Sequence, residues 1–215
     1  VFRTLIVPWE LQKKILIKGS PLMINEALWA AGMAMLSQSY STRGLAVVAA
    51  VNISSTIFNV FNVLYISLGN AVSIIVGQTL GAGRMEEAKD IDTKLIAASV
   101  LSCAALGVVM AVVAPLFPRI YNTTSEVRDL ASGFIRILAV FMPVQAFINA
   151  CYFTLRSGGK TVVTMLFDSV FVWTVSIPLA RILTGRTALP ILVIYFCCQA
   201  VELLKALIGY ILLKK

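Results

Sequence analysis

The 215-residue sequence contains no histidine and only four cysteines. Histidine is the commonest general acid or base and a frequent zinc ligand, so its absence argues against most acid–base enzymes and against a cysteine–histidine zinc site. The sequence also lacks a GxxxxGK[ST] motif for binding nucleotide phosphates. We therefore expect neither an enzyme nor a bound cofactor. The cysteines lie within apolar runs without CxxC spacing, and we expect buried, unpaired thiols at Cys103, Cys151, Cys197 and Cys198.

Charged residues are also scarce, at 13% of the sequence, against about 25% in a soluble domain. Hydrophobic residues make up 59%, and the mean hydropathy is +0.91. Because a helix that crosses a bilayer uses about 20 residues, this apolar content predicts about six spans. The net charge of +8 would suit nucleic acid in a soluble protein, but the basic residues lie at the ends of apolar runs. We therefore expect the lipid bilayer, and no nucleic acid, as a partner.

Six apolar segments are long enough to cross a bilayer, and short turns join them. Backbone groups in lipid must be bonded within the segment, and a barrel strand would be about half as long, so helices are the consistent structure. The sequence therefore predicts an all-α, polytopic membrane protein. A short segment (1–14) precedes a transmembrane domain (15–215), whose predicted spans are residues 15–38, 47–78, 95–116, 130–155, 162–182 and 188–213.

Lysine and arginine are unevenly distributed between the two sets of loops. Eleven lie on the side that includes both ends of the chain and five on the other side, while Arg136 and Lys205 fall within spans. Since cytoplasmic loops carry the excess of Lys and Arg, we expect both ends of this segment in the cytoplasm and the spans in the plasma (inner) membrane. The sequence begins at Val1 without a secretory signal, so we expect a piece of a longer protein.

Glu26 is the most deeply placed carboxylate in the predicted spans. It follows Lys14 by twelve residues, about 18 Å along a helix, which places it near the middle of a bilayer about 30 Å thick. An ionisable side chain there costs at least about 2.5 kcal/mol and normally faces a partner or a water-filled cavity. Glu26 is thus a candidate to exchange a proton or to bind Na⁺ or an organic cation. The alternative is a structural partner for a buried Lys or Arg.

Three other ionisable residues lie within the last two spans. Glu202 and Lys205 are three residues apart in the sixth span, so they can neutralise each other on one helix face. The alternative is that Lys205 is the counter-ion of Glu26. Asp168 lies near the start of the fifth span, where water at the membrane surface can reach it, and we expect a structural role for it.

Two spans carry polar side chains on one face. In the second span, a turn of 100° per residue places four asparagines within one arc, namely Asn52, Asn59, Asn62 and Asn70. In the fourth span, three polar residues share a face after the proline at position 143, namely Gln145, Asn149 and Tyr152. We predict that a cavity is lined by Asn52, Asn59, Asn62, Gln145, Asn149 and Tyr152. Hydrogen bonding between helices is the alternative.

Two stretches of the sequence resemble the multidrug and toxic compound extrusion (MATE) transporters. One is GNAVSIIVGQTLGAGRMEEAKD from Gly69, and the other is LRSGGKT from Leu155. Their glycines would let the chain turn at the cytoplasmic surface, and the acidic pair Glu86 and Glu87 suits a helix N-terminus. The resemblance extends over essentially the whole chain, including PLMINEALWAAG (21–32) and DSVFVWTVSIPLA (168–180).

The resemblance implies a larger protein with twelve spans in two six-helix lobes, of which this chain is the C-terminal lobe and the N-terminal lobe is the partner. It implies a secondary antiporter that exports small organic cations in exchange for H⁺ or Na⁺ by alternating access. Glu26 matches the family's seventh-span glutamate, which is implicated in binding the coupling ion or the substrate. Gln145 stands where some members have an aspartate, so Glu26 is the only central carboxylate expected.

Two other functions are compatible with a helical membrane lobe. A flippase for lipid-linked saccharides from the same superfamily would need several buried basic residues for phosphate groups, and this sequence has few. A non-transporting membrane scaffold would leave the polar stripe unexplained.

Overall fold

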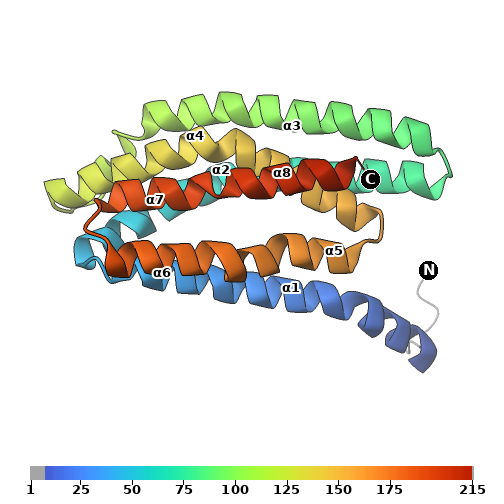
Figure 1. Ribbon diagram of the computed structural model, residues 1–215. Coiled ribbons are helices and arrows are strands. Elements are labelled where there is room, and N and C mark those ends of the chain that lie inside the picture. The colour runs from blue at the N-terminus through green and yellow to red at the C-terminus, as the bar shows by residue number, and fades with distance from the viewer. Residues whose placement is uncertain (1–7, 215) are drawn as a thin grey trace.

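The structure, a computed structural model, describes residues 8–214 apart from the side chains of Lys18 and Thr161. Over these residues every regular element is helical, and the helices run back and forth along one axis as a bundle (Figure 1). The first four passages of the bundle are α1 (Trp9–Ser41), α2 (Leu45–Gly81), α3 (Met85–Val113) and α4 (Ser125–Ser157), with the 3₁₀ turn η1 (Phe117–Ile120) before α4.

The last two passages are interrupted helices. The fifth consists of α5 (Thr161–Met165), the π-helical turns η2 (Leu166–Val170) and η3 (Val172–Ser176), and α6 (Ile177–Arg186). The sixth consists of α7 (Ile191–Ala200) and α8 (Glu202–Leu213), which meet at Val201. Each predicted span therefore corresponds to one passage of the bundle, and the all-α, six-passage architecture is confirmed.

Five of the six passages in the described chain are long and apolar enough to cross a membrane, and α1 is not among them. The span predicted at residues 15–38 is one continuous helix in the structure, but it is less apolar than the other five. The physical reason is composition, because α1 carries five charged residues in 33, namely Glu10, Lys13, Lys14, Lys18 and Glu26. This helix starts at Trp9, so residues 9–14 of the predicted preceding segment are helical and continuous with the span, while residues 1–7 lie outside the described residues.

The central helix of the bundle is α4. It packs against α2 and α3 on one side and against α7 and α8 on the other (Figure 1). Its largest side chains are fully buried there, including Phe134, Ile135 and Met142. By contrast, the outer faces of α3 and α8 expose aliphatic side chains such as Leu101, Val108 and Leu207. A buried central helix with apolar outer faces is the arrangement expected of a bundle surrounded by lipid.

The glycine-rich stretches form the tight turns expected of them. Gly83 ends α2 with φ +77°, and Gly159 ends α4 with φ +75°. In each case the following residue donates its backbone N–H five residues back, from Arg84 to Thr79 and from Lys160 to Leu155. This is the hydrogen-bond pattern of a Schellman motif, which closes a helix through a left-handed glycine. The predicted acidic pair, Glu86 and Glu87, lies in the first turn of α3.

All four cysteines are free. Cys103, Cys151 and Cys198 are buried as predicted, while Cys197 is only half-buried on α7.

Candidate functional site: a polar cavity and a chain of hydrogen bonds

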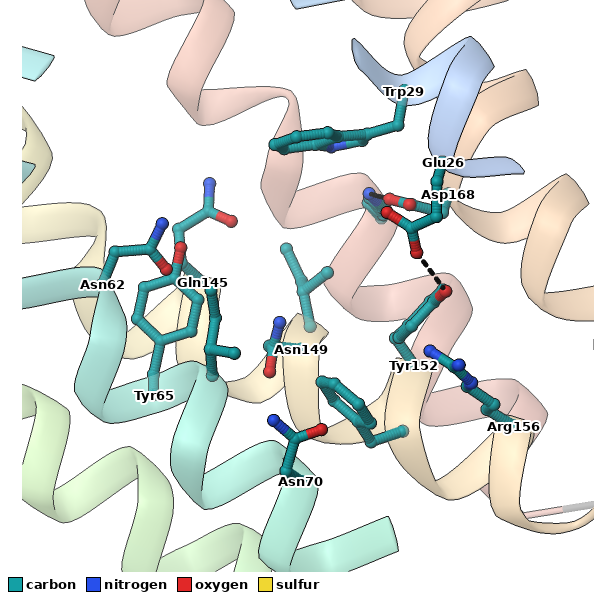
Figure 2. Close-up of a pocket in the computed structure, with 14 residues that line it drawn as sticks. Glu26, Trp29, Asn62, Tyr65, Asn70, Gln145, Asn149, Tyr152, Arg156 and Asp168 are labelled. Atoms are coloured by element: carbon teal, nitrogen blue, oxygen red, sulfur yellow. Dashed lines mark hydrogen bonds and ion pairs between the residues drawn. The ribbon is translucent and has the colours of Figure 1, made fainter. Parts of the chain in front are cut away.

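A cavity of about 370 Å³ lies among α1, α2, α4, η2 and α8 (Figure 2). Its volume falls within the range of small-molecule sites, which is about 300–1,000 Å³. A second cavity of about 240 Å³ adjoins it, since both are lined by Trp29, Asn62, Tyr65, Gln145 and Lys205. The polar faces of α2 and α4 therefore enclose a space large enough for a small ligand.

Most residues of the predicted lining reach these cavities. Asn149 and Tyr152 line the first cavity and Asn59 lines the second, while Asn62 and Gln145 line both. Asn52 lines neither cavity and is exposed. Asn52 lies three residues before Ser55, the first residue of α2 that lines the second cavity, and so falls just beyond the end of that cavity.

The two sides of the cavity differ in charge. In Figure 2 the neutral side chains of Asn62, Tyr65 and Gln145 lie on one side. Opposite them lie Glu26 and Asp168, next to Tyr152 and Arg156. A ligand between these sides would therefore meet amides and an aromatic ring on one flank and ionisable groups on the other.

Lys205 is buried, and its Nζ atom lies 2.7 Å from Oδ1 of Asp168. The sequence offers Glu202, on the same helix face, or Glu26 as the charge partner of Lys205, and the ion pair in the structure is instead with Asp168. Lys205 lines both cavities, sharing the first with Asp168 from η2 and the second with Glu202 of its own helix. Asp168 is therefore both the partner of a buried lysine and part of the cavity wall.

Asn25 connects this ion pair to the rest of the site. Its Nδ2 atom lies 3.4 Å from Oδ2 of Asp168 and 3.4 Å from the hydroxyl oxygen of Tyr152. The hydroxyl of Ser169 is 2.6 Å from Oδ1 of Asn25 and 2.9 Å from the Asn25 backbone oxygen. Because the ionised carboxylate of Asp168 can only accept, the amide nitrogen of Asn25 faces it and the amide oxygen faces the Ser169 hydroxyl.

Glu26 is the last member of the chain of hydrogen bonds. The hydroxyl of Tyr152 donates to Oε1 of Glu26 at 3.4 Å, the contact drawn as a dashed line in Figure 2. Glu26 itself is exposed, and it has no cationic group within 4.0 Å among the side chains that the structure describes, which exclude that of Lys18. The chain thus runs from Lys205 through Asp168, Asn25 and Tyr152 to an open carboxylate.

The fifth passage carries Asp168 and Ser169 as neighbours on the π-helical turn η2. A π turn adds a residue to a helical turn, which rotates the following side chains by about 100° and is common at functional sites. Pro178 lies just after η3 and cannot donate to the carbonyl of Thr174, which loosens the helix there. The Trp173 indole N–H then bonds the Leu28 carbonyl at 2.9 Å, which anchors η3 to α1.

Three residues of this hydrogen-bonded network are not among the residues predicted for the site: Asn25, Asp168 and Ser169. Asn25 is 1% exposed although it adjoins the exposed Glu26, and an amide in an apolar helix next to a carboxylate is a signal that could have found it. No local pattern identifies Ser169, because a π turn brings it to Asn25 from 144 residues away.

Two amide oxygens of the residues that line the cavity lack a hydrogen-bond partner. Oδ1 of Asn62 and Oδ1 of Asn149 are buried and accept no hydrogen bond from the described residues. The carboxylate of Glu26 and the rings of Trp29 and Tyr65, which line the cavity, offer a cation a negative charge and aromatic faces. The arrangement is therefore suited chemically to binding a positively charged group.

The MatE family profile matches residues 21–182 of this chain. The chain is 28% identical over 196 residues to a protein of Oceanobacillus iheyensis named probable multidrug resistance protein NorM. The aligned region is 88% of this chain and 42% of that protein. The chain is also 21% identical over 175 residues to a Thermotoga maritima protein of the same name. Here the aligned region is 81% of this chain and 38% of that protein. The chain thus spans less than half of these relatives.

Solved structures show the same fold. The chain superposes on a transporter of the MOP superfamily from Pyrococcus furiosus with a TM-score of 0.83 at 19% identity, covering 92% of this chain and 44% of the other. It superposes on an outward-facing multidrug resistance transporter of the MATE family with a TM-score of 0.79 at 21% identity, with the same coverage of both chains. The six-passage bundle therefore corresponds to about one half of such proteins.

Proposed function

Because the chain belongs to the MatE family, we propose that it forms one lobe of a secondary transporter that exports organic cations in exchange for H⁺ or Na⁺. Family members are transporters rather than enzymes, and two relatives carry names that refer to multidrug resistance. The chain matches less than half the length of those relatives, which is consistent with a second lobe of similar size. That second lobe, from the N-terminal part of the full-length protein, would enclose the cavity with this one.

The observation that carries this proposal is the open carboxylate of Glu26 at the edge of the cavity. The Asp168 carboxylate is matched by Lys205, whereas Glu26 receives only the Tyr152 hydroxyl among the described groups. A carboxylate that faces a cavity can hold either a coupling ion or a cationic substrate, and the two compete for one charge. Such competition is the simplest basis for exchange.

Alternating access would couple this competition to movement of the two lobes. A ligand shifts a conformational equilibrium only through its different affinity for the two states. The coupling ion at Glu26 would favour one orientation and the organic cation the other. We propose that the glycine turns at Gly83 and Gly159 face the cytoplasm together with both ends of this lobe, because Lys and Arg concentrate on that side.

Transport by the reconstituted full-length protein carrying Glu26→Gln tests this proposal. The neutral amide keeps the size of the side chain but removes its charge, so we expect drug export to fall by about tenfold or more, equivalent to about 1.4 kcal/mol. Glu26→Asp keeps the charge and should retain more activity than Glu26→Gln. Normal export by Glu26→Gln at normal expression would contradict the assignment of Glu26, though not the transporter function.

The matched control is Glu87→Gln. Glu87 is exposed in the first turn of α3, where it pairs with Arg84 at 2.9 Å, far along the chain from any cavity residue. We expect this variant to export at the normal rate. Measurements with separately imposed proton and sodium gradients then identify the coupling ion, since only the coupled gradient will drive export by the unsubstituted protein.

A further inference from the structure

We propose that Lys205 sets how many carboxylates of the cavity take part in cation exchange, by neutralising Asp168 from within the protein. This inference rests on the proposed function, because it concerns the cations that bind and leave the same cavity. Lys205 acts here as a built-in counter-cation. Its presence leaves Glu26 in the exchange and keeps Asp168 out of it.

The contacts of Asp168 support this role. Its Oδ1 atom accepts from the ammonium of Lys205 at 2.7 Å, and its Oδ2 atom faces the Asn25 amide nitrogen at 3.4 Å. The side chain of Lys205 is 6% exposed and that of Asp168 is 18% exposed. Neither charge can be satisfied by bulk water at this burial, so each stabilises the other. An incoming cation would have to displace a covalently attached ammonium to reach Asp168.

The ammonium of Lys205 is also fixed in position. It lies 5.4 Å from the centre of the Phe167 ring, close enough for a cation–π contact. Asn25 in turn cannot rotate away from Asp168 without losing the hydrogen bond from Ser169 to its oxygen. The ion pair is therefore held by α1, η2 and α8 together, so a cation in the cavity meets a carboxylate that is already neutralised.

Other ionisable groups face the same cavities. Glu26 on α1, Arg156 on α4 and the hydroxyls of Tyr65 and Tyr152 line the first cavity, and Glu202 on α8 lines the second. Arg156 and Glu202 form no ion pair within 4.0 Å in the described part of the chain. The absolute number of exchanged charges depends on all of them. Because Glu202 and Lys205 line the same cavity, a change at Lys205 alters the surroundings of Glu202 as well as those of Asp168. The comparison of Lys205→Met with Lys205→Met/Asp168→Asn therefore isolates the contribution of Asp168.

Loss of the Lys205 charge would bring Asp168 into the exchange. An unpaired carboxylate at this burial is costly as an anion, so it would take up a proton in the empty cavity. A bound organic cation would then favour the ionised form of Asp168 and release that proton. The protons balance, because Asp168 takes one proton from water while the cavity is empty and returns it to water when the organic cation binds.

The test measures protons released per bound tetraphenylphosphonium ion by the purified full-length protein in weakly buffered detergent solution. For Lys205→Met, whose side chain is apolar and close in length to lysine, we expect about one more proton per bound cation than for the unsubstituted protein. Adding Asp168→Asn to this variant should remove the extra proton. Lys205→Arg keeps the charge and should give no extra proton.

The matched control is Lys89→Met, which removes an exposed lysine that pairs with Glu86 at 2.8 Å on α3. It should leave the proton count unchanged. An unchanged count in Lys205→Met, or loss of tetraphenylphosphonium binding by it, would overturn the inference. If Lys205→Met fails to purify as a folded protein, the double variant Lys205→Met/Asp168→Asn is measured instead. Fewer protons released per bound cation than in the unsubstituted protein would mean that Asp168 already takes part in exchange. That result would also overturn the inference.

The outcomes separate this inference from the proposed function. The proposed exchange at Glu26 is wrong if the unsubstituted protein releases no proton when it binds tetraphenylphosphonium and if Glu26→Gln binds this cation equally well. If the unsubstituted protein releases protons through Glu26 and Lys205→Met releases the same number, only the role of Lys205 is wrong.

Discussion

Gly69 of α2 lies directly against Asn149 of α4 at the wall of the cavity. A Cβ atom added at Gly69 would collide with the amide oxygen of Asn149 and lie 2.5 Å from Cδ2 of the Phe153 ring. Both Asn149 and Phe153 line the cavity. The close approach of α2 and α4 at this glycine therefore positions one wall of the proposed cation site.

We expect Gly69→Ala to destabilise the protein and to weaken cation binding. An extra methyl group in a packed interface forces neighbouring side chains or backbone to move, at a cost of about 1–3 kcal/mol. The side chains that must move here are those of Asn149 and Phe153. Thermal unfolding of the purified full-length protein and its affinity for tetraphenylphosphonium would both report this change.

Gly77→Ala on the same helix is the control for that experiment. A Cβ atom at Gly77 would meet only Cβ of Ser157, at 3.7 Å, an ordinary contact. Alanine in a helix interior is favoured over glycine by about 0.5–1 kcal/mol, so this variant should unfold at the same temperature or higher. Equal unfolding temperatures for the two variants would contradict the steric argument at Gly69.

A hydrogen bond between α3 and α4 gives a second prediction. The hydroxyl of Thr154 donates to Oδ1 of Asp92 at 2.6 Å across 62 residues of sequence. Thr154→Val keeps the shape of the side chain but removes the donor from a partly buried carboxylate, which should cost about 1.5–3 kcal/mol of unfolding free energy. Thr93→Val is the control, since the exposed Thr93 hydroxyl bonds only the Lys89 carbonyl of its own helix. A comparable loss of stability in both variants would argue against the interhelical bond.

The different positions of Asn52 and Asn62 can be tested by cysteine labelling. We expect tetraphenylphosphonium to slow the reaction of Asn62→Cys with a water-soluble maleimide, because Asn62 lines both cavities. The label at Asn52→Cys should react at the same rate with and without the cation, since Asn52 lines neither. The background protein needs its own thiols replaced, at Cys103, Cys151, Cys197 and Cys198. Equal protection at both positions would show that the ligand extends beyond these cavities.

The helices, their turns and much of the cavity lining could be predicted from the sequence because each depends on local pattern. Apolar runs of span length predict helices, and Gly83 and Gly159 predict the turns that a left-handed glycine closes. The spacing of Asn59 and Asn62 on α2 predicts a shared face, and that face does line a cavity. Periodicity fixes a direction around the helix axis, but it does not fix how far the cavity extends, which is why Asn52 was included.

The partner of Lys205 could not be predicted in the same way. Helical spacing favours Glu202 at i–3, but a buried lysine pairs with whichever carboxylate the tertiary fold brings to it, and here that is Asp168 from another passage. The register of the fifth passage depends on two π-helical turns, which no apolar period reveals. Asn25 gains its position from Ser169 on that same π-helical segment, so the errors at these residues share one cause.

The glycine turn between α2 and α3 gives a last prediction, in which two similar substitutions have opposite effects. Gly83 has φ +77°, where a side chain costs about 1–2 kcal/mol, so Gly83→Ala should lower the unfolding free energy by about that amount. Gly81 is the last residue of α2, with helical backbone and no atom within 4 Å of an added Cβ, so Gly81→Ala should be neutral or stabilising by up to about 1 kcal/mol. Thermal unfolding of both variants in one detergent checks this. Both variants replace an exposed glycine with alanine, so they differ mainly in backbone conformation. Unfolding temperatures that shift in the same direction in both would mean that the turn does not depend on the left-handed glycine.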